Sequence, residues 1–185
     1  MIRLFDILFA IVGLLLLSPV FVLIVLVLFI DTGSPIFSQK RIGRNRVIFT
    51  VFKFRTMDAR TKDVATHLVD PSLVTPLGKC LRRFKVDELP QLWNVLKGDM
   101  SLVGPRPCLT NQRDIIKERE KLGIFDALPG ITGLAQIKNV DMSDPRKLSM
   151  TDKQMLESLS IYIYFRYIFL TLFGKGHGDH LNDIK

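Results

Sequence analysis

Two adjacent carboxylates, Asp87 and Glu88, are the residues of this sequence best suited to chemistry. One interpretation is structural: Asp87 caps a helix and Glu88 lies in its first turn, each contributing about 1 kcal/mol or less. The other is catalytic. A carboxylate kept ionised by Arg82 and by helix amides is a nucleophile, and a second carboxylate holds Mg²⁺ together with phosphate oxygens. The pair alone leaves both interpretations open. Four cations precede it: Lys79, Arg82, Arg83 and Lys85.

Other catalytic arrangements are missing from the sequence. It contains neither a glycine-rich phosphate loop of the Walker or dinucleotide type nor a serine in a nucleophile elbow. Its two cysteines and three histidines have no spacing typical of a disulfide framework or a zinc site. Arg106, held between two prolines, is a fork suited to phosphate, and Lys53 and Arg55 add further cations. With the two carboxylates, these cations form a set suited to phosphoryl transfer.

Composition narrows the class of protein. The 185 residues carry a formal net charge of +8, and 48% of them are hydrophobic, which excludes a disordered tail. A chain both basic and apolar is typical of proteins that bind nucleic acid, or that lie on an anionic membrane with phosphorylated substrates. Residues 7–30 carry no charge. As a straight helix they would measure roughly 36 Å, against roughly 30 Å for the hydrocarbon core of a bilayer.

Ser18-Pro19 lies at the centre of this apolar run. Proline removes one helical hydrogen bond and clashes with the carbonyl four residues back, and a serine hydroxyl satisfies a freed backbone group. Each half measures about 17 Å, roughly one leaflet. Both a helix–break–helix that re-enters one leaflet and a spanning helix with a proline kink fit this geometry.

Charge next to the run predicts its orientation. Basic residues mark the cytoplasmic side of a membrane segment. Four of them follow the run and indicate that its C-terminal flank is cytoplasmic, whereas Arg3 alone precedes the run and is weaker support for a cytoplasmic N-terminus. We therefore expect a membrane segment over residues 1–31 and a cytoplasmic, membrane-associated catalytic domain over residues 32–185. The basic residues that follow the run are Lys40, Arg41, Arg44 and Arg46.

Local patterns predict an α+β fold that is mainly α. Besides the N-terminal segment we expect one small β-hairpin and several short amphipathic or interfacial helices. Asp87 is expected to cap a helix with Leu89, Leu92, Trp93 and Leu96 on its buried face and Gly98 at its end. The other expected elements are hairpin strands over 34–40 and 47–57, a loop or broken helix over 58–75, a helix that starts at Thr75-Pro76, a charged helix over 111–122 and a final helix over 151–173.

Three motifs show a resemblance to a known family. They are residues 53–57 (KFRTM), 86–107 (VDELPQLWNVLKGDMSLVGPRP) and 129–136 (PGITGLAQ). They resemble the bacterial sugar transferases, specifically the small monotopic polyprenyl-phosphate glycosyl-1-phosphate transferases. The likeness covers nearly the whole chain, including the apolar run with its central Ser18-Pro19, at which the family's re-entrant helix turns.

The resemblance implies an enzyme on the cytoplasmic face of the bacterial inner membrane. It would transfer a sugar 1-phosphate from a UDP-sugar to undecaprenyl phosphate, releasing UMP and starting surface glycan synthesis. Asp87 would form a covalent phospho-aspartyl sugar intermediate and Glu88 would bind Mg²⁺. Arg82 and Arg106 would bind phosphate. The further implied substrate contacts are Lys53, Arg55 and Gln136, and the implied support is Asp152, bracing Arg82.

The chain departs from the family pattern in places. Leu128 stands where members often carry arginine, and residues 138–140 (KNV) replace a frequent Asn-Gly-Arg, which puts sugar or nucleotide contacts from that stretch in doubt. The sequence does not show which sugar is transferred, what the Gly/Lys/His tail at 174–180 does, or the oligomeric state, for which a homodimer stays open.

Two other functions compete with the transferase. The first is a membrane-tethered protein whose basic hairpin binds nucleic acid or anionic lipid without catalysis. The second is a purely structural anchor. We expect the transferase, with no nucleic-acid partner.

Overall fold

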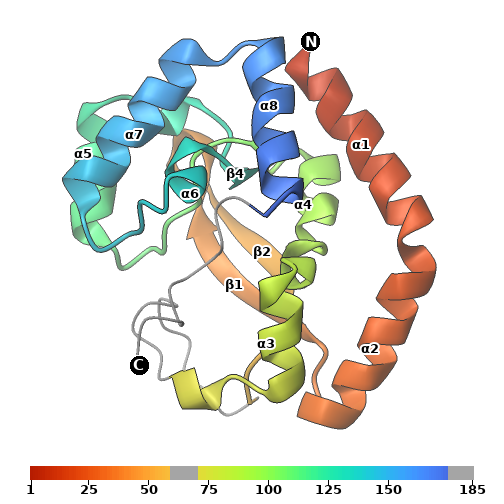
Figure 1. Cartoon of the computed structure of the whole chain (residues 1–185). Coiled ribbons are helices and arrows are strands. Elements are labelled where there is room, and N and C mark those ends of the chain that lie inside the picture. The colour runs from red at the N-terminus through yellow and green to blue at the C-terminus, as the bar shows by residue number, and fades with distance from the viewer. Residues whose placement is uncertain (59–70, 175–185) are drawn as a thin grey trace.

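The computed structural model describes residues 1–58 and 71–174. Two N-terminal helices form an arc along one side of the molecule, and a β-hairpin lies in its middle (Figure 1). The fold is mainly helical, as expected, with small sheets. The helices are α1 (Ile2–Leu16), α2 (Ser18–Thr32), α3 (Pro76–Arg83), α4 (Gln91–Lys97), α5 (Arg113–Lys121), α6 (Leu134–Ile137), α7 (Pro145–Ser158) and α8 (Ile161–Leu172), and the strands are β1 (Ile36–Ile42), β2 (Ile48–Phe54), β3 (Ser101–Val103) and β4 (Gly130–Thr132).

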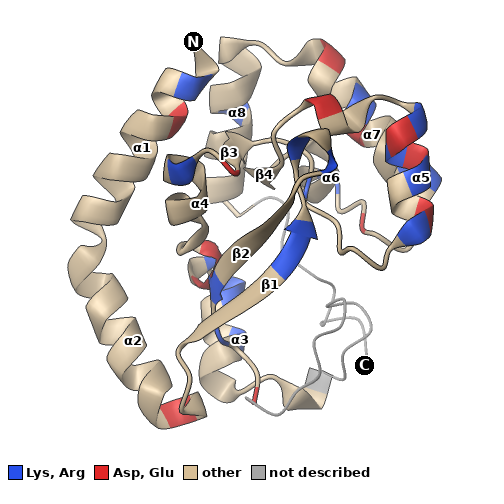
Figure 2. Cartoon of the chain, turned by 180° about the vertical axis from the view of Figure 1, so that it is seen from behind, with Lys and Arg blue, Asp and Glu red and all other residues tan. Residues whose placement is uncertain are grey.

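The apolar N-terminal run is broken where the sequence predicts. α1 ends at Leu16, α2 begins at Ser18, and the two helices are bent by 62°. Ser18 Oγ donates a hydrogen bond to the Leu15 carbonyl (2.8 Å), and Pro19 lies in the first turn of α2, where its missing N–H costs nothing. No single described helix is long and apolar enough to cross a membrane; α1 and α2 reach that length and apolarity only together. Figure 2 shows charge on them only near their outer ends.

Polar contacts hold the start of α1 against the rest of the chain. Asp6, which is 1% exposed, accepts hydrogen bonds from the Ser101 hydroxyl (3.0 Å), the Leu102 N–H (2.9 Å) and the Tyr164 hydroxyl (2.8 Å). Arg3 donates to carbonyl oxygens of the last turn of α4, the shortest bond being 2.6 Å to Val95. The beginning of α1 is therefore fixed to α4, β3 and α8.

The expected hairpin is confirmed. β1 and β2 pair antiparallel from Ile36 opposite Phe54 to Ile42 opposite Ile48. Asn45 in the connecting turn has a φ of 54°, a conformation that asparagine tolerates better than most residues. Val51 packs in a cluster with Ala10 of α1, and Phe54 packs in a cluster with Leu28 of α2. Val51 and Lys53 are two residues apart, so their side chains lie on the same face of β2.

The helices on either side of the carboxylate pair differ in part from the expectation. α3 begins as predicted, with the Thr75 hydroxyl accepting from Gly78 N–H (2.9 Å). Asp87 caps no helix: it lies in a 3₁₀ turn, and α4 starts only at Gln91. Trp93 is 52% exposed and not on the buried face, because polar Asn94 takes the inner position and bonds to the β2 backbone.

β3 and β4 form a short parallel pair, with Ser101 opposite Gly130 and Val103 opposite Thr132. Two glycines allow the backbones to approach. A Cβ on Gly130 would lie 2.0 Å from the Gly104 backbone nitrogen, so no larger residue fits there. This contact joins residues far apart in sequence, and no local pattern predicts it.

The C-terminal helices also correct one expectation. The single helix expected over 151–173 is two helices, α7 and α8, separated at Leu159-Ser160. The Ser160 hydroxyl accepts from Ile163 N–H (3.3 Å) and caps α8. The charged helix α5 ends before Gly123 as predicted. The loop expected over 58–75 lies mostly, and the tail at 174–180 almost entirely, outside the described residues.

Candidate active site

The carboxylate pair lies on a strained turn between α3 and α4. Asp87 and Glu88 belong to the 3₁₀ turn Val86–Glu88, and Lys85 before it has a φ of 55°. A left-handed conformation costs a residue with a side chain about 1–2 kcal/mol. Strain of this kind is typical of functional sites. The turn directs the two adjacent carboxylates into different surroundings.

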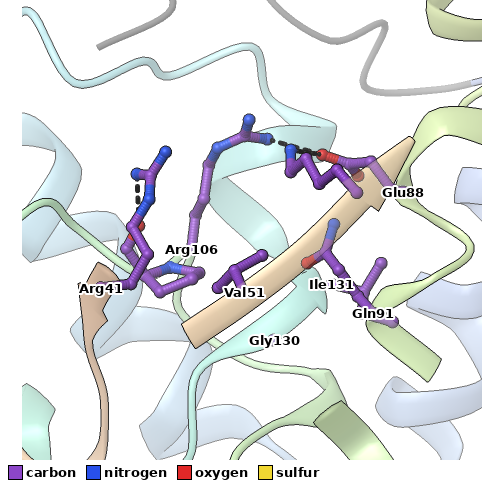
Figure 3. Close-up of a pocket in the computed structure, with 9 residues that line it drawn as sticks. Arg41, Val51, Glu88, Gln91, Arg106, Gly130 and Ile131 are labelled. Atoms are coloured by element: carbon purple, nitrogen blue, oxygen red, sulfur yellow. Dashed lines mark hydrogen bonds and ion pairs between the residues drawn. The ribbon is translucent and has the colours of Figure 1, made fainter. Parts of the chain in front are cut away.

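Glu88 is tied to two cations from distant parts of the chain. Lys53 Nζ on β2 lies 2.6 Å from Glu88 Oε1, and Arg106 Nη1 lies 3.6 Å from the same oxygen. Figure 3 shows the Arg106 and Glu88 side chains extended toward one another. Burial raises the pKa of Glu88, but Lys53 and then Arg106 outweigh burial and hold this pKa at about 2. Glu88 is therefore ionised at neutral pH.

Asp87 has the opposite shift. Burial, and then the charge of Glu88, raise the pKa of Asp87 to about 6, while Lys53, Arg82 and Arg106 limit the rise. Among the described residues, no donor forms a hydrogen bond with its carboxylate. The cations thus leave Asp87 mainly ionised at neutral pH, as a nucleophile must be, although its pKa is raised by burial.

Arg106 lies on a segment held by its backbone. Each flanking proline lacks an N–H, so the segment is fixed through carbonyl oxygens. Four consecutive carbonyls, those of residues 105–108, accept hydrogen bonds from other elements. The donors are Gly130 N–H (2.9 Å), Arg119 Nη1 (2.8 Å), Arg41 Nη1 (3.0 Å) and Ile42 N–H (2.9 Å), in that order.

A pocket opens beside Glu88 and Arg106 (Figure 3). Its charged walls come from the hairpin, the 3₁₀ turn and the Arg106 segment, and Val51, Pro107 and Ile131 are its apolar walls. Glu88 lines the pocket, and its neighbour Asp87 does not. A pocket with several cations beside a carboxylate suits a phosphorylated ligand. The site prediction missed two polar side chains of this lining, Arg41 and Gln91. In the sequence, Arg41 appears only as part of a basic run, and the signal for Gln91 was its position four residues after Asp87.

Of the predicted cations, Arg82 lies at the site and Arg55 does not. The Arg82 Nε donates to the Thr56 hydroxyl (2.8 Å), and its charge acts on Asp87. Arg55 turns toward the start of β1, where its Nε donates to the Ser34 carbonyl (2.9 Å). β2 ends at Phe54, so the alternation that faces Lys53 to the pocket does not extend to Arg55.

Gln136 and Asp152 also lie elsewhere than expected. Gln136 Nε2 donates to the Ile131 carbonyl (3.4 Å). Ile131 lines the pocket, and Gln136 does not. Asp152 forms an ion pair with Arg119 (2.7 Å) and not with Arg82. Both side chains are at most 2% exposed, and Arg119 also bonds to the Arg106 carbonyl. Asp152 therefore braces the Arg106 segment through Arg119. Its helix, α7, packs on α5, the helix that carries Arg119.

The two carboxylates fit Mg²⁺ only with help from a substrate. In the part of the chain that the structure describes, no group of three or more acidic, histidine or cysteine residues could hold a metal ion. Mg²⁺ is commonly held by one or two carboxylates with substrate phosphates and water. Glu88 and Asp87 supply that number of carboxylates.

The structure combines an apolar bent helix pair with a carboxylate pair surrounded by cations, an arrangement suited to phosphoryl transfer. A family model described as bacterial sugar transferase matches residues 1–175. The chain belongs to the bacterial sugar transferase family.

Curated relatives agree with this family. The galactosyl transferase CpsE of Streptococcus agalactiae serotype III (strain NEM316) is 40% identical over 184 residues, which cover 92% of this chain and 41% of CpsE. An undecaprenyl-phosphate glucose phosphotransferase of Komagataeibacter xylinus is 39% identical, with 92% and 35% covered. The chain thus spans less than half of either relative. It spans 84% of the uncharacterized sugar transferase EpsL of Bacillus subtilis (strain 168), at 36% identity.

Proposed function

We propose that this protein transfers a sugar 1-phosphate from a UDP-sugar to undecaprenyl phosphate at the cytoplasmic face of the bacterial inner membrane. The observation that carries the proposal is the difference between two adjacent carboxylates, Glu88 bound by cations and Asp87 left without a hydrogen-bond donor among the described residues. The Komagataeibacter relative is named for this kind of reaction with glucose, whereas CpsE is named for galactose. The sugar is therefore left open.

The reaction proceeds in two displacements at one phosphorus atom. An oxygen of the Asp87 carboxylate attacks the phosphorus linked to the sugar, the bond from that phosphorus to the bridging oxygen breaks, and UMP leaves with the electron pair. A phosphate oxygen of undecaprenyl phosphate then attacks the same phosphorus. The Asp87 carboxylate leaves, and the product is a polyprenyl diphosphate sugar.

The surrounding cations stabilise the charge on the phosphoryl oxygens. Lys53 and Arg106 lie at the carboxylate pair, and the carbonyl contacts of residues 105–108 keep Arg106 in place. Glu88 would hold Mg²⁺, which when bound supplies further charge neutralisation to the diphosphate.

We also propose that α1 and α2 re-enter one leaflet. Contacts of Arg3 and Asp6 tie the start of α1 to the same body of the protein that α2 joins through β1. Apolar side chains such as Leu16, Leu23 and Ile30 are exposed along the outer side of the pair, and lipid would cover them.

The break at Ser18-Pro19 allows the membrane topology to be tested. Replacing Pro19 with Leu should favour a straight spanning helix and move residue 2 across the membrane. Labelling of a cysteine at position 2 in intact cells measures this. Labelling from outside in the otherwise native protein would contradict re-entry.

The enzymatic proposal is tested by incubating the purified full chain with a panel of UDP-sugars, Mg²⁺ and undecaprenyl phosphate. We expect UMP release with at least one donor. Without the lipid we expect one equivalent of UMP and a sugar-phosphate mass on the peptide that contains Asp87. No UMP with any donor would overturn the proposal, and salt-dependent nucleic-acid binding without UMP release would support the competing binding protein.

A further inference from the structure

Gln91 is a buried amide that the fold itself does not use. It begins α4 and is 3% exposed, and its Nε2 has no hydrogen-bond partner among the residues that the structure describes. Burying an amide donor without a partner lowers the free energy of unfolding. A buried group of this kind needs an explanation, and a ligand that supplies the missing partner is one.

Asn94, one turn further along α4, shows how the fold treats an amide that it uses for structure. Its Nδ2 donates to the Thr50 carbonyl (2.7 Å) and to the Asp99 carboxylate (3.2 Å), and its Oδ1 accepts from Phe52 N–H (3.2 Å). Asn94 thereby joins α4 to β2. The two amides are both buried on one short helix, and Asn94 alone is hydrogen-bonded to its neighbours.

The position of Gln91 points to the ligand. Its side chain lines the pocket together with Lys53, Glu88 and Arg106 (Figure 3). In the described ranges, other buried side-chain atoms also lack a hydrogen-bond partner. Those of Arg119, Gln136, Ser149 and Asp152 belong to residues that do not line this pocket.

We infer that the Gln91 amide donates a hydrogen bond to an oxygen of the sugar phosphate that is being transferred. This inference rests on the proposed function. Asp87 reacts at the phosphorus linked to the sugar, so the oxygens of that group lie beside Glu88, where Gln91 reaches the pocket. Lys53 attracts phosphate as a point charge, whereas a neutral amide on a helix orients a phosphate oxygen through a directed hydrogen bond.

The decisive variant is Gln91→Met, which keeps the size of the side chain and removes the donor. We expect kcat/KM for the UDP-sugar, measured by UMP release, to fall about 10- to 100-fold. The thermal midpoint Tm should stay unchanged or rise, because no protein partner is lost. Inhibition by UMP should keep its constant, since UMP lacks the sugar phosphate. In case Gln91→Met folds poorly, Gln91→Glu keeps the shape, and its added negative charge should lower kcat/KM further.

Gln112 provides the matched control. Its Oε1 accepts from Leu109 N–H (2.8 Å) and its Nε2 donates to Met142 Sδ (3.4 Å), and it lies outside the pocket lining. Gln112→Met should therefore lower Tm and leave kcat/KM of the folded protein within about twofold.

Three results would count against Gln91. An unchanged kcat/KM in Gln91→Met, a loss that only follows the folded fraction, or an equal weakening of UMP inhibition would each overturn the inference while an active wild type leaves the proposed function standing. A wild type that releases no UMP overturns the proposed function and this inference with it.

Discussion

Asp6 and Asp87 are two buried aspartates that the same chain treats in opposite ways. Three donors, from Ser101, Leu102 and Tyr164, bind the Asp6 carboxylate at 2.8–3.0 Å. The carboxylate of Asp87, whose residue is 9% exposed, is balanced by nearby charges and has no such donor among the described residues. A carboxylate bound by three donors is a structural anchor, whereas one balanced only by charge keeps its oxygens available for a reaction.

The largest expected effect comes from Asp87→Asn. An amide is a very poor nucleophile, so turnover should fall at least about 10⁴-fold, with little change in Tm. UMP release and the mass of the Asp87 peptide measure it. Asp6→Asn is the matched change at the other aspartate, and there the folded protein should keep most of its activity. Full turnover by Asp87→Asn would end the distinction between the two residues.

Removing the Asp6 carboxylate should lower the stability of the fold. Asp6→Ala leaves three buried donors without a partner, and we expect a loss of about 3 kcal/mol or more in the free energy of unfolding. Tyr164→Phe removes one partner and should cost about 1 kcal/mol. Denaturation in detergent micelles measures both. An Asp6→Ala protein as stable as the wild type would show that these bonds do not hold α1.

A smaller effect is expected at the charges around Asp87. Arg106→Lys keeps the charge but loses the planar fork, so kcat/KM should fall about 10- to 100-fold with the fold preserved. The carbonyl contacts of residues 105–108 do not involve the Arg106 side chain, so circular dichroism should be unchanged. Wild-type kinetics in this variant would remove Arg106 from the site.

The smallest effect concerns protonation in the metal-free protein. Asp87 should titrate near pH 6, as followed by NMR of ¹³C-labelled carboxylates. Because the folded pKa lies above the unfolded one, the folded state holds this proton longer, and the contribution of Asp87 to stability falls as the pH rises from about 4 to about 6. Glu88→Gln removes a neighbouring negative charge and should lower the pKa of Asp87. A pKa that rises in this variant would contradict the proposed interaction.

Local signals predicted the elements that depend on neighbours in sequence. The break at Ser18-Pro19, the hairpin and the Thr75 cap all follow from one or two residues with strong backbone preferences. The single helix expected over 151–173 is two, because Ser160, directly before an apolar run, caps a second helix. The parallel β3–β4 pair was missed because its contact at Gly104 and Gly130 joins distant segments.

The site was predictable only in its residue types. The structure brings Lys53, Glu88 and Arg106 together, as the motifs suggest. It turns Arg55 away and pairs Asp152 with Arg119, because strand ends and helix packing decide where a side chain points.

The bond between Asp6 and Tyr164 bears on how the chain is made. The two residues are 158 positions apart, which corresponds to about 8–30 s of synthesis on a ribosome that adds 5–20 residues per second. Ser101 and Leu102 emerge earlier, but Tyr164 belongs to α8. A carboxylate without donors is costly within lipid. During translation, then, Asp6 gains its first donors only once Ser101 and Leu102 have been made, and its set of donors is complete only when α8 follows.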